Sequence, residues 1–144
     1  MNAAGDEMPP RPDPEDPLLR GHWEAARRGE LAVQRCAGCG QFQWPPRETC
    51  GRCAAAGPGW EAVHGAGTLF TWTVVHHTVI APPAAPPFAV GIIALRGAPV
   101  RMLGRITGIA PGDLEFGLPL EVAFEAGSDG VSLPTWRPLG GGGR

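Results

Sequence analysis

Four cysteines are the residues of this chain best suited to chemistry, and they form two pairs of identical spacing. Two residues separate Cys36 from Cys39 and two separate Cys50 from Cys53, with ten residues between the pairs. Four thiolates in two closely spaced pairs can close a tetrahedron around Zn²⁺, which is how structural zinc sites are built. A closed site leaves no open coordination position, so we expect it to fold the protein and to perform no chemistry.

Three other uses of these cysteines compete with structural zinc. Iron fits the same cage, because the ligand set alone does not choose between the two metals. Two disulfides would need an oxidising compartment, whereas the acidic, proline-rich first residues show no secretory or transit signal and predict a reducing, cytoplasmic location. A redox pair normally occurs once, at a helix start in a βαβ unit. We therefore predict one structural zinc per chain and keep iron as an alternative.

The segment before the cysteines predicts one helix and one strand. Asp16-Pro17 is typical of a helix N-cap followed by proline at the first helical position, and Gly29 is a natural stop, so we predict a helix over 17–28. Residues 31–35 predict a short strand that leads into the first cysteine pair. The apolar face of the helix would carry Leu19, Trp23 and Ala26.

Beyond the cysteines the apolar pattern changes to a period of two, which is typical of half-buried strands. At 68–80 the apolar side chains, including Phe70, occupy the even positions. Residues 88–95 are apolar on both faces and predict an interior strand. Gly104 predicts a bulge or a barrel bend, and the proline-rich segment 81–87 predicts a stiff loop. The predicted strands are 68–80, 88–95, 100–107, 120–125 and 131–137.

Five short strands, turns rich in glycine and proline, and no second long helix favour a small closed β-barrel. An OB-fold is the commonest five-strand solution that removes exposed edges, and a Greek-key sandwich is the alternative. We therefore predict a mostly β chain with four parts. These are a disordered acidic tail at 1–15, a helix plus zinc ribbon at 16–58, a five-stranded OB-fold barrel at 59–138 and a flexible tail at 139–144.

The composition limits the functions open to this chain. Its 144 residues are 43% hydrophobic, which supports one modest core that a metal would help to stabilise. Glycine, proline or arginine interrupts every apolar run, so no membrane span is predicted. The net charge of −2 gives no global attraction to nucleic acid or to anionic lipid.

His76 and His77 are the other residues with catalytic potential. A histidine base needs a nucleophile or a carboxylate within hydrogen-bond reach, but only threonines are near in sequence and the nearest acid is Glu61. We expect His76 to pack on the barrel face and His77 to meet solvent or a partner. We predict no catalytic residues and no enzymatic activity of the chain by itself.

The order of these segments resembles the bacterial and archaeal zinc-ribbon/OB-fold proteins associated with acyl-CoA enzymes. The resemblance extends from residue 18 to residue 138, and all four cysteine positions are filled. The matching pieces are HWEAARRGEL at 22–31, QRCAGCGQFQWPPRETCGRC at 34–53, GTLFTWTVVH at 67–76, PPFAVGIIAL at 86–95, GLPLEVAFE at 117–125 and LPTWRP at 133–138.

The resemblance implies a rubredoxin-like zinc ribbon, an OB-fold and an association with a partner enzyme. Such proteins are non-catalytic subunits or appended domains beside thiolase-like enzymes, steroid side-chain aldolases, acyltransferases or enoyl-CoA hydratases. By this resemblance the helix, ribbon and barrel would dock on the partner and help to hold the CoA thioester. A single-stranded nucleic-acid-binding module is the alternative, since zinc ribbons and OB-folds both serve that role.

The arginines are unevenly distributed. Residues 18–55 carry six arginines against three glutamates, a local net charge of +3, whereas residues 60–138 have a net charge of −2. A local excess of three suits a few phosphates, as on the nucleotide part of CoA, better than a long nucleic-acid backbone. Surface ion pairs or a partner interface are equal alternatives. The candidates for CoA-phosphate or partner contact are Arg20, Arg27, Arg28 and Arg35.

Tryptophans and prolines supply the candidates for a partner interface. Trp23, Trp44 and Trp60 flank the ribbon, and indoles beside a small metal site usually add apolar area that it cannot otherwise bury. We expect Trp44 and Trp60 to be buried, while Trp23 is either buried or an interface anchor. The stiff loop is either a docking element or a plain connector. The interface candidates are Trp23, Pro82, Pro83, Pro86 and Pro87.

Overall fold

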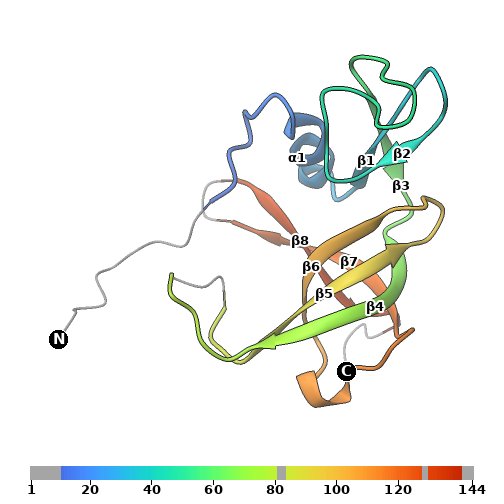
Figure 1. Cartoon of the computed structure of the whole chain (residues 1–144). Helices are drawn as coiled ribbons and strands as arrows, with labels where there is room; N and C mark the ends of the chain where they lie inside the picture. Colours follow the sequence, from blue (N-terminus) through green and yellow to red (C-terminus); the bar gives the residue numbers. More distant parts are fainter. Residues whose placement is uncertain (1–10, 81–83, 128–129, 141–144) are drawn as a thin grey trace.

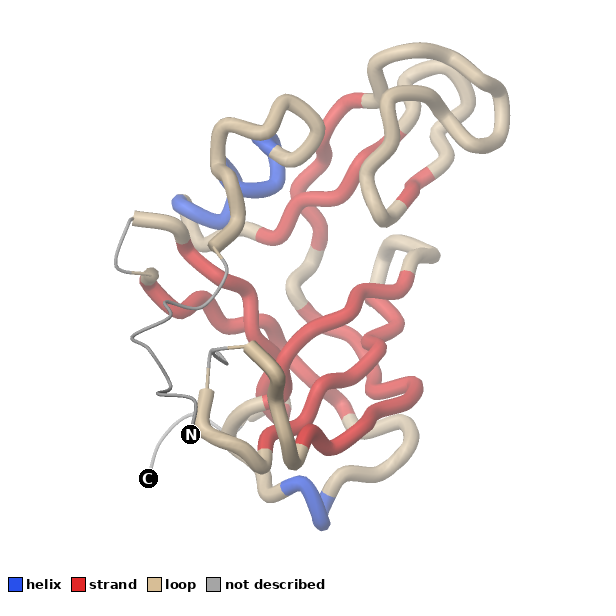
Figure 2. The backbone as a smooth tube through the Cα atoms, turned by 60° about the vertical axis from the view of Figure 1, so that its left-hand side comes forward, coloured by secondary structure: helices blue, strands red, loops and turns tan. Residues whose placement is uncertain are grey.

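The computed structural model describes residues 11–80, 84–127 and 130–140 of the chain. Its elements in chain order are α1 (Arg20–Arg27), β1 (Leu31–Arg35), β2 (Phe42–Gln43), β3 (Gly59–Val63), β4 (Ala66–Val75), β5 (Phe88–Leu95), β6 (Arg101–Ile106), the 3₁₀-helix η1 (Pro111–Asp113), β7 (Pro119–Ala126) and β8 (Ser132–Pro138). The helix and a three-stranded sheet form one end of the molecule, and a five-stranded barrel forms the other (Figures 1 and 2).

The helix α1 is shorter at its start than the sequence predicts. Asp16 is not its N-cap, because Leu19 occupies that position and makes no side-chain cap bond. The Oδ1 of Asp16 instead accepts a hydrogen bond from the backbone N–H of Leu18 at 2.9 Å. This bond spans two residues and closes a turn, so the regular helix begins only at Arg20. Of the predicted apolar face, Ala26 is buried while Leu19 and Trp23 are half-buried.

The end of α1 confirms the predicted glycine stop. Gly29 has φ +73°, and its N–H donates to the carbonyl of Ala26 at 3.0 Å. The N–H of Glu30 donates to the carbonyl of Ala25 at 3.0 Å. This pair of bonds is a Schellman motif, which needs the left-handed backbone that glycine adopts at little cost.

The three-stranded sheet has β1 at its centre, with β2 and β3 antiparallel on either side. β3 pairs with β1 along its whole length, from Val63 opposite Leu31 to Gly59 opposite Arg35. Residues 59–63 therefore pair within the ribbon's sheet. Only two residues, His64 and Gly65, then separate this sheet from the first barrel strand.

The barrel closes in the order β4-β5-β6-β8-β7, which confirms the predicted five-stranded OB-fold and not a sandwich. Four of the five strand pairings are antiparallel. The pairing of β6 with β8 is parallel, at Ile106 and Trp136. Trp136 is 1% exposed and lies in the central core cluster with Leu69, Ile93 and Leu120.

The apolar face of β4 differs from the predicted even positions. The pairing of β4 with β5 shifts between Leu69 and Thr71, which marks a β-bulge at Phe70. Leu69 before the bulge is fully buried and Trp72 after it packs against the core, while Phe70 points outward and is 39% exposed. His76 lies beyond the end of β4 and is exposed, so the prediction that it packs on the barrel is wrong.

Gly104 does not mark a bulge, because β5 and β6 stay in continuous register on both sides of it. Its α-carbon lies against the buried indole of Trp136, and a Cβ there would collide with that ring. Glycine at this position thus allows a close approach inside the barrel.

β5 lies inside the sheet, as predicted, but only one of its two apolar faces is covered by this chain. Ala89, Gly91, Ile93 and Leu95 point inward and are buried, whereas the alternate residues are only half-buried. A strand this apolar on its outer side is unusual for a surface strand. The described part of the chain covers this outer side only in part.

The predicted tails fall largely outside the described residues, including 1–10 and 141–144. Residues 13–16 form a turn, in which Oδ1 of Asp13 accepts from the N–H of Glu15 at 2.9 Å. Within the described ranges, no helix has the length and apolar character needed to cross a bilayer.

Candidate metal centre

The two cysteine pairs lie on two turns with the same backbone geometry. In the first turn the N–H of Gly40 donates to the carbonyl of Cys36 at 2.9 Å, and in the second the N–H of Ala54 donates to that of Cys50 at 3.0 Å. Both closing residues have a left-handed backbone, with φ +73° for Gly40 and +61° for Ala54. The left-handed backbone of Ala54 could not be predicted from the sequence, because non-glycine residues rarely adopt positive φ.

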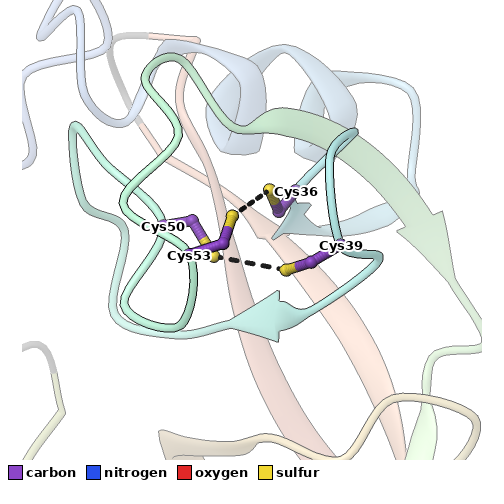
Figure 3. A group of neighbouring side chains, drawn as sticks. All are labelled: Cys36, Cys39, Cys50 and Cys53. Carbon is purple, nitrogen blue, oxygen red and sulfur yellow. Dashed lines mark hydrogen bonds between the residues drawn. The ribbon is translucent and has the colours of Figure 1, made fainter.

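The turns bring the four sulfurs together at metal-binding distance (Figure 3). All four Sγ atoms lie within 4.8 Å of one another. Cys36 Sγ is 3.5 Å from Cys53 Sγ, and Cys39 Sγ is 3.6 Å from Cys50 Sγ. A tetrahedral ion with metal–sulfur bonds of about 2.3 Å requires sulfurs roughly 3.8 Å apart, so the cage is close to the size that Zn²⁺ requires. None of these cysteines forms a disulfide.

Backbone N–H groups favour the thiolate form at two of the four positions. The N–H groups of Cys53 and Arg52 lower the pKa of the Cys50 thiol to about 6. The pKa of Cys36 is lowered chiefly by the N–H of Cys39. Hydrogen bonds to sulfur stabilise its charged form, which is the form that binds metal.

Cys53 shows why the cage needs a cation. The N–H of Ala55 lowers the pKa of Cys53, but the neighbouring sulfurs of Cys36 and Cys39 outweigh it and raise the pKa to about 11. Four crowded sulfurs cannot all ionise without a positive ion among them. With a divalent ion bound, all four positions of the tetrahedron are filled by protein, so the site is structural.

The arginines proposed for CoA or partner contact are not gathered in one place. Arg28 pairs with Glu30 at 3.2 Å, and Arg35 pairs with Glu61 at 2.9 Å. Arg20 lies at the start of α1 and Arg27 at its end; both are exposed.

The three tryptophans near the ribbon surround a residue that the sequence analysis passed over, His22. Its ring centroid lies 4.9 Å from those of Trp23 and Trp44 and 6.3 Å from that of Trp60. All three indoles are half-buried, so the burial predicted for Trp44 and Trp60 is partial. The Nε1 of Trp23 is buried and has no hydrogen-bond partner in the described structure.

The remaining candidates lie on the loop between β4 and β5. Pro86 and Pro87 are exposed and joined by a cis peptide bond. Pro82 and Pro83 lie outside the described residues. His76 and His77, at the start of this loop, make no hydrogen bond or ion pair with the described part of the chain.

Two family profiles match consecutive stretches of the sequence. Residues 23–59 match the ChsH2 rubredoxin-like zinc ribbon domain, and residues 60–125 match the ChsH2 C-terminal OB-fold domain. The first match covers the cysteine cage and the second covers β4 to β7 of the barrel. These matches identify the metal as the zinc of a zinc ribbon.

Among curated proteins, the chain is similar to subunits of hydratases. It is 31% identical, over 89% of its length, to a probable enoyl-CoA hydratase alpha subunit of Thermomonospora curvata. It is 30% identical, over 81% of its length, to the 3-oxo-4,17-pregnadiene-20-carboxyl-CoA hydratase alpha subunit of Mycobacterium tuberculosis. The chain spans only 40% and 36% of the length of these two relatives.

Among solved structures, the chain is similar to one titled Ltp2-ChsH2(DUF35) aldolase, with a TM-score of 0.80, 28% identity and coverage of 89% of this chain and 98% of that one. It is also 33% identical, over 67% of its length, to a DUF35 domain-containing scaffold protein of Methanocaldococcus jannaschii, of which it covers 72%. This identity extends over most of the scaffold protein, and we conclude that the chain belongs to the DUF35 family of zinc-ribbon and OB-fold proteins.

Proposed function

We propose that this chain is a non-catalytic subunit or domain that docks on an acyl-CoA-processing enzyme and helps to hold the CoA thioester. The names of its relatives support this proposal, since two are alpha subunits of CoA-ester hydratases and one structure is an aldolase assembly. Most of each hydratase subunit lies outside the region that this chain matches, so a hydratase activity is not transferred to it. The closed cysteine cage also has no open position for chemistry.

The observation that carries the proposal is an apolar patch on the outside of the barrel. We call Phe70, Ile92, Leu103 and Phe116 the barrel face. Ile92 lies directly between its neighbours Thr71 and Leu103 in the sheet register. The rings of Phe70 and Phe116 meet edge to face with centroids 6.1 Å apart.

This barrel face is much more exposed than a folded chain normally leaves its large apolar residues. Phe70 is 39% exposed, Leu103 66% and Phe116 73%. The guanidinium of Arg101 lies 3.7 Å from the centre of the Phe70 ring and borders the face. Contiguous apolar patches rimmed by polar groups mark protein interfaces, and aromatic residues and arginine are enriched in them.

The contacts predicted from the sequence remain part of this proposal. Pro86 and Pro87 are exposed on the loop that leaves β4, so they could extend a docking surface. Of the four arginine candidates, Arg28 and Arg35 pair with glutamates, which leaves Arg20 and Arg27 as the better candidates for partner contact.

A pull-down from the source organism tests the docking proposal. We expect the tagged chain to retain an acyl-CoA-processing enzyme, identified by mass spectrometry, and to lose it when Leu103→Glu and Phe116→Glu are combined. A charge in the centre of an apolar interface is costly to bury. Val79→Glu is the matched control, because Val79 is fully exposed on a loop.

Two outcomes would contradict the proposal. One is a wild-type chain that retains no enzyme of this class. The other is a double variant, folded by circular dichroism, that still retains the enzyme as well as the wild type does.

The structure gives little support to the alternative of a single-stranded nucleic-acid module. Such OB-folds need a basic groove along the barrel with aromatic platforms. Here Arg105 on β6 is paired with Glu125, and the outer side of β5 is apolar.

A further inference from the structure

A groove of about 730 Å³ separates the ribbon from the barrel. One wall is built from the ribbon, by the segment 41–44 with Arg47 and by the second cysteine turn at Gly51 and Arg52. The other wall is the turn between β5 and β6, residues 99–101. The volume lies within the range of small-molecule sites in proteins.

The groove is lined by three arginines and by no acidic residue. Arg47 and Arg52 come from the ribbon, and Arg101 comes from the barrel. None of the three guanidinium groups has a carboxylate partner in the described structure. By contrast, carboxylates pair with the arginines elsewhere on the two sheets, namely Arg35, Arg105 and Arg137.

Several arginines without carboxylate partners in the lining of one groove are typical of phosphate sites. The planar guanidinium donates two parallel hydrogen bonds to phosphate oxygens, and such charge-assisted bonds are stronger than neutral ones. Three arginines supply a charge of about +3, which matches a diphosphate better than a single phosphate or a carboxylate. Trp44 and Phe42, also in the lining, offer aromatic surface to a base.

Two glutamine side chains hold the backbone of the loop that carries the arginines on the ribbon side. Gln34 is 3% exposed; its Oε1 accepts from the N–H of Arg47 at 2.8 Å, and its Nε2 donates to the carbonyl of Arg47 at 3.1 Å. Gln43 donates to Gln34 at 2.7 Å and accepts from the N–H of Gly51 at 3.1 Å. These bonds fix the loop that carries Arg47 and Arg52 before any ligand binds, which lowers the entropy lost on binding.

The third arginine is positioned by a different contact. The guanidinium of Arg101 is stacked on the ring of Phe70, so its side chain is restricted although it is exposed. A ligand in the groove would therefore meet arginines from two parts of the fold, two on a loop whose backbone is held by hydrogen bonds and one whose side chain is restricted by Phe70.

We infer that this groove binds the diphosphate of a nucleotide-type ligand, the chemical class that includes the nucleotide end of CoA. The inference deepens the proposed function, since it names a site for the CoA part of the substrate. It assigns that site to Arg47, Arg52 and Arg101, and not to the four arginines predicted from the sequence.

Titration calorimetry on the zinc-loaded chain tests the inference, with ADP, CoA and pyrophosphate as probes. We expect ADP and CoA to bind, with an affinity that falls as salt is raised. Arg52→Gln and Arg101→Gln should each weaken binding at least about tenfold, because each removes a charge-assisted contact. Arg96→Gln is the matched control, since Arg96 is exposed on the same turn as Arg101 but outside the groove lining.

The probes distinguish the possible sources of the phosphate. Pyrophosphate binding as tight as that of ADP supports a site that recognises the diphosphate alone, whereas tighter binding of ADP and CoA supports a base contact as well. Absence of binding by all three probes at millimolar concentration would overturn the inference. So would equal weakening by Arg96→Gln.

Two further outcomes would also overturn the assignment. One is binding of an oligothymidylate with a steep salt dependence while ADP does not bind, which would indicate a nucleic-acid site. The other is loss of zinc from Arg52→Gln with unchanged ADP affinity in Arg101→Gln. The titration needs no partner enzyme, so a failed pull-down and an empty groove are distinguishable results.

Discussion

At the scale of single residues, His22 connects the helix to the ribbon. Its Nδ1–H donates to the carbonyl of Ala32 at 3.1 Å, and its ring is 3% exposed among three indoles. Because the carbonyl can only accept, the ring carries its proton on Nδ1, and the neutral form leaves Nε2 bare. Burial lowers the pKa of His22, and the bond to Ala32 opposes this only in part.

The lowered pKa of His22 predicts a loss of stability in mild acid. The unfolded chain takes up this proton near pH 6.5, but the folded chain does so only at lower pH. Between the two values the unfolded state binds more protons, so the free energy of unfolding falls as pH falls below about 6.5 and levels off below the folded pKa. Urea unfolding from pH 8 to pH 5, with zinc content checked, should show this slope.

The matched variants are His22→Gln, which should flatten the slope, and His77→Gln, which should leave it unchanged because His77 is exposed. A slope that persists in His22→Gln at constant zinc content would show that other groups cause it.

Ala54 gives a second prediction for a single residue, and here the substitution should stabilise the protein. Its φ of +61° places its Cβ against the following carbonyl, which costs about 1–2 kcal/mol, whereas glycine adopts this backbone freely. Glycine also gives the unfolded chain more conformational entropy, which offsets part of this gain. We therefore expect Ala54→Gly to stabilise the protein by about 0.5–1 kcal/mol in a thermal unfolding experiment. Ala56→Gly, where φ is not positive, should destabilise it instead; stabilisation by both changes would argue against backbone strain.

At the scale of the elements, much of the fold could be predicted because its signals are local. The cysteine spacing identifies the two zinc turns, Gly29 ends the helix, and the period-two segments correspond to the five barrel strands. The bulge at Phe70 could not be predicted, since an extra residue in one strand changes the pairing without changing the alternation of the sequence. That bulge turns Phe70 outward, onto the barrel face.

The groove could not be predicted for a related reason. Arg47 and Arg52 contribute to the basic ribbon, but Arg101 lies on a turn that is far away in sequence. Only the close approach of the ribbon to the β5–β6 turn brings the three together. The sequence instead favours Arg20, Arg27, Arg28 and Arg35, which lie close together along the chain.

The ribbon is the element whose folding depends on metal. We expect about one zinc per chain, and Cys36→Ser should lose the metal and unfold or aggregate, because Cys36 is buried in the cage and metal affinity is folding free energy here. Zinc analysis together with circular dichroism before and after chelation measures both effects. Ala37→Ser, an exposed change in the same turn, is the control. A metal-free wild type that remains fully folded would contradict a structural role.

At the scale of the whole molecule, the near-neutral net charge conceals a separation of charge. The helix and ribbon are basic and the barrel is slightly acidic, while the first 17 residues hold five acids against one arginine. Arg101 belongs to two surfaces, because it lines the groove and also borders the apolar barrel face. A ligand in the groove and a partner on the barrel face would therefore lie next to each other.

The two-residue passage from β3 to β4 has a mechanical consequence. Gly65 accepts a hydrogen bond from the N–H of Val122 at 2.7 Å, and a Cβ on it would collide with the Val122 side chain, so the passage is fixed to β7. These contacts restrict bending at the passage, so we expect the ribbon and the barrel to move together. An enzyme bound to the barrel would then also fix the direction of the ribbon and the width of the groove between the two.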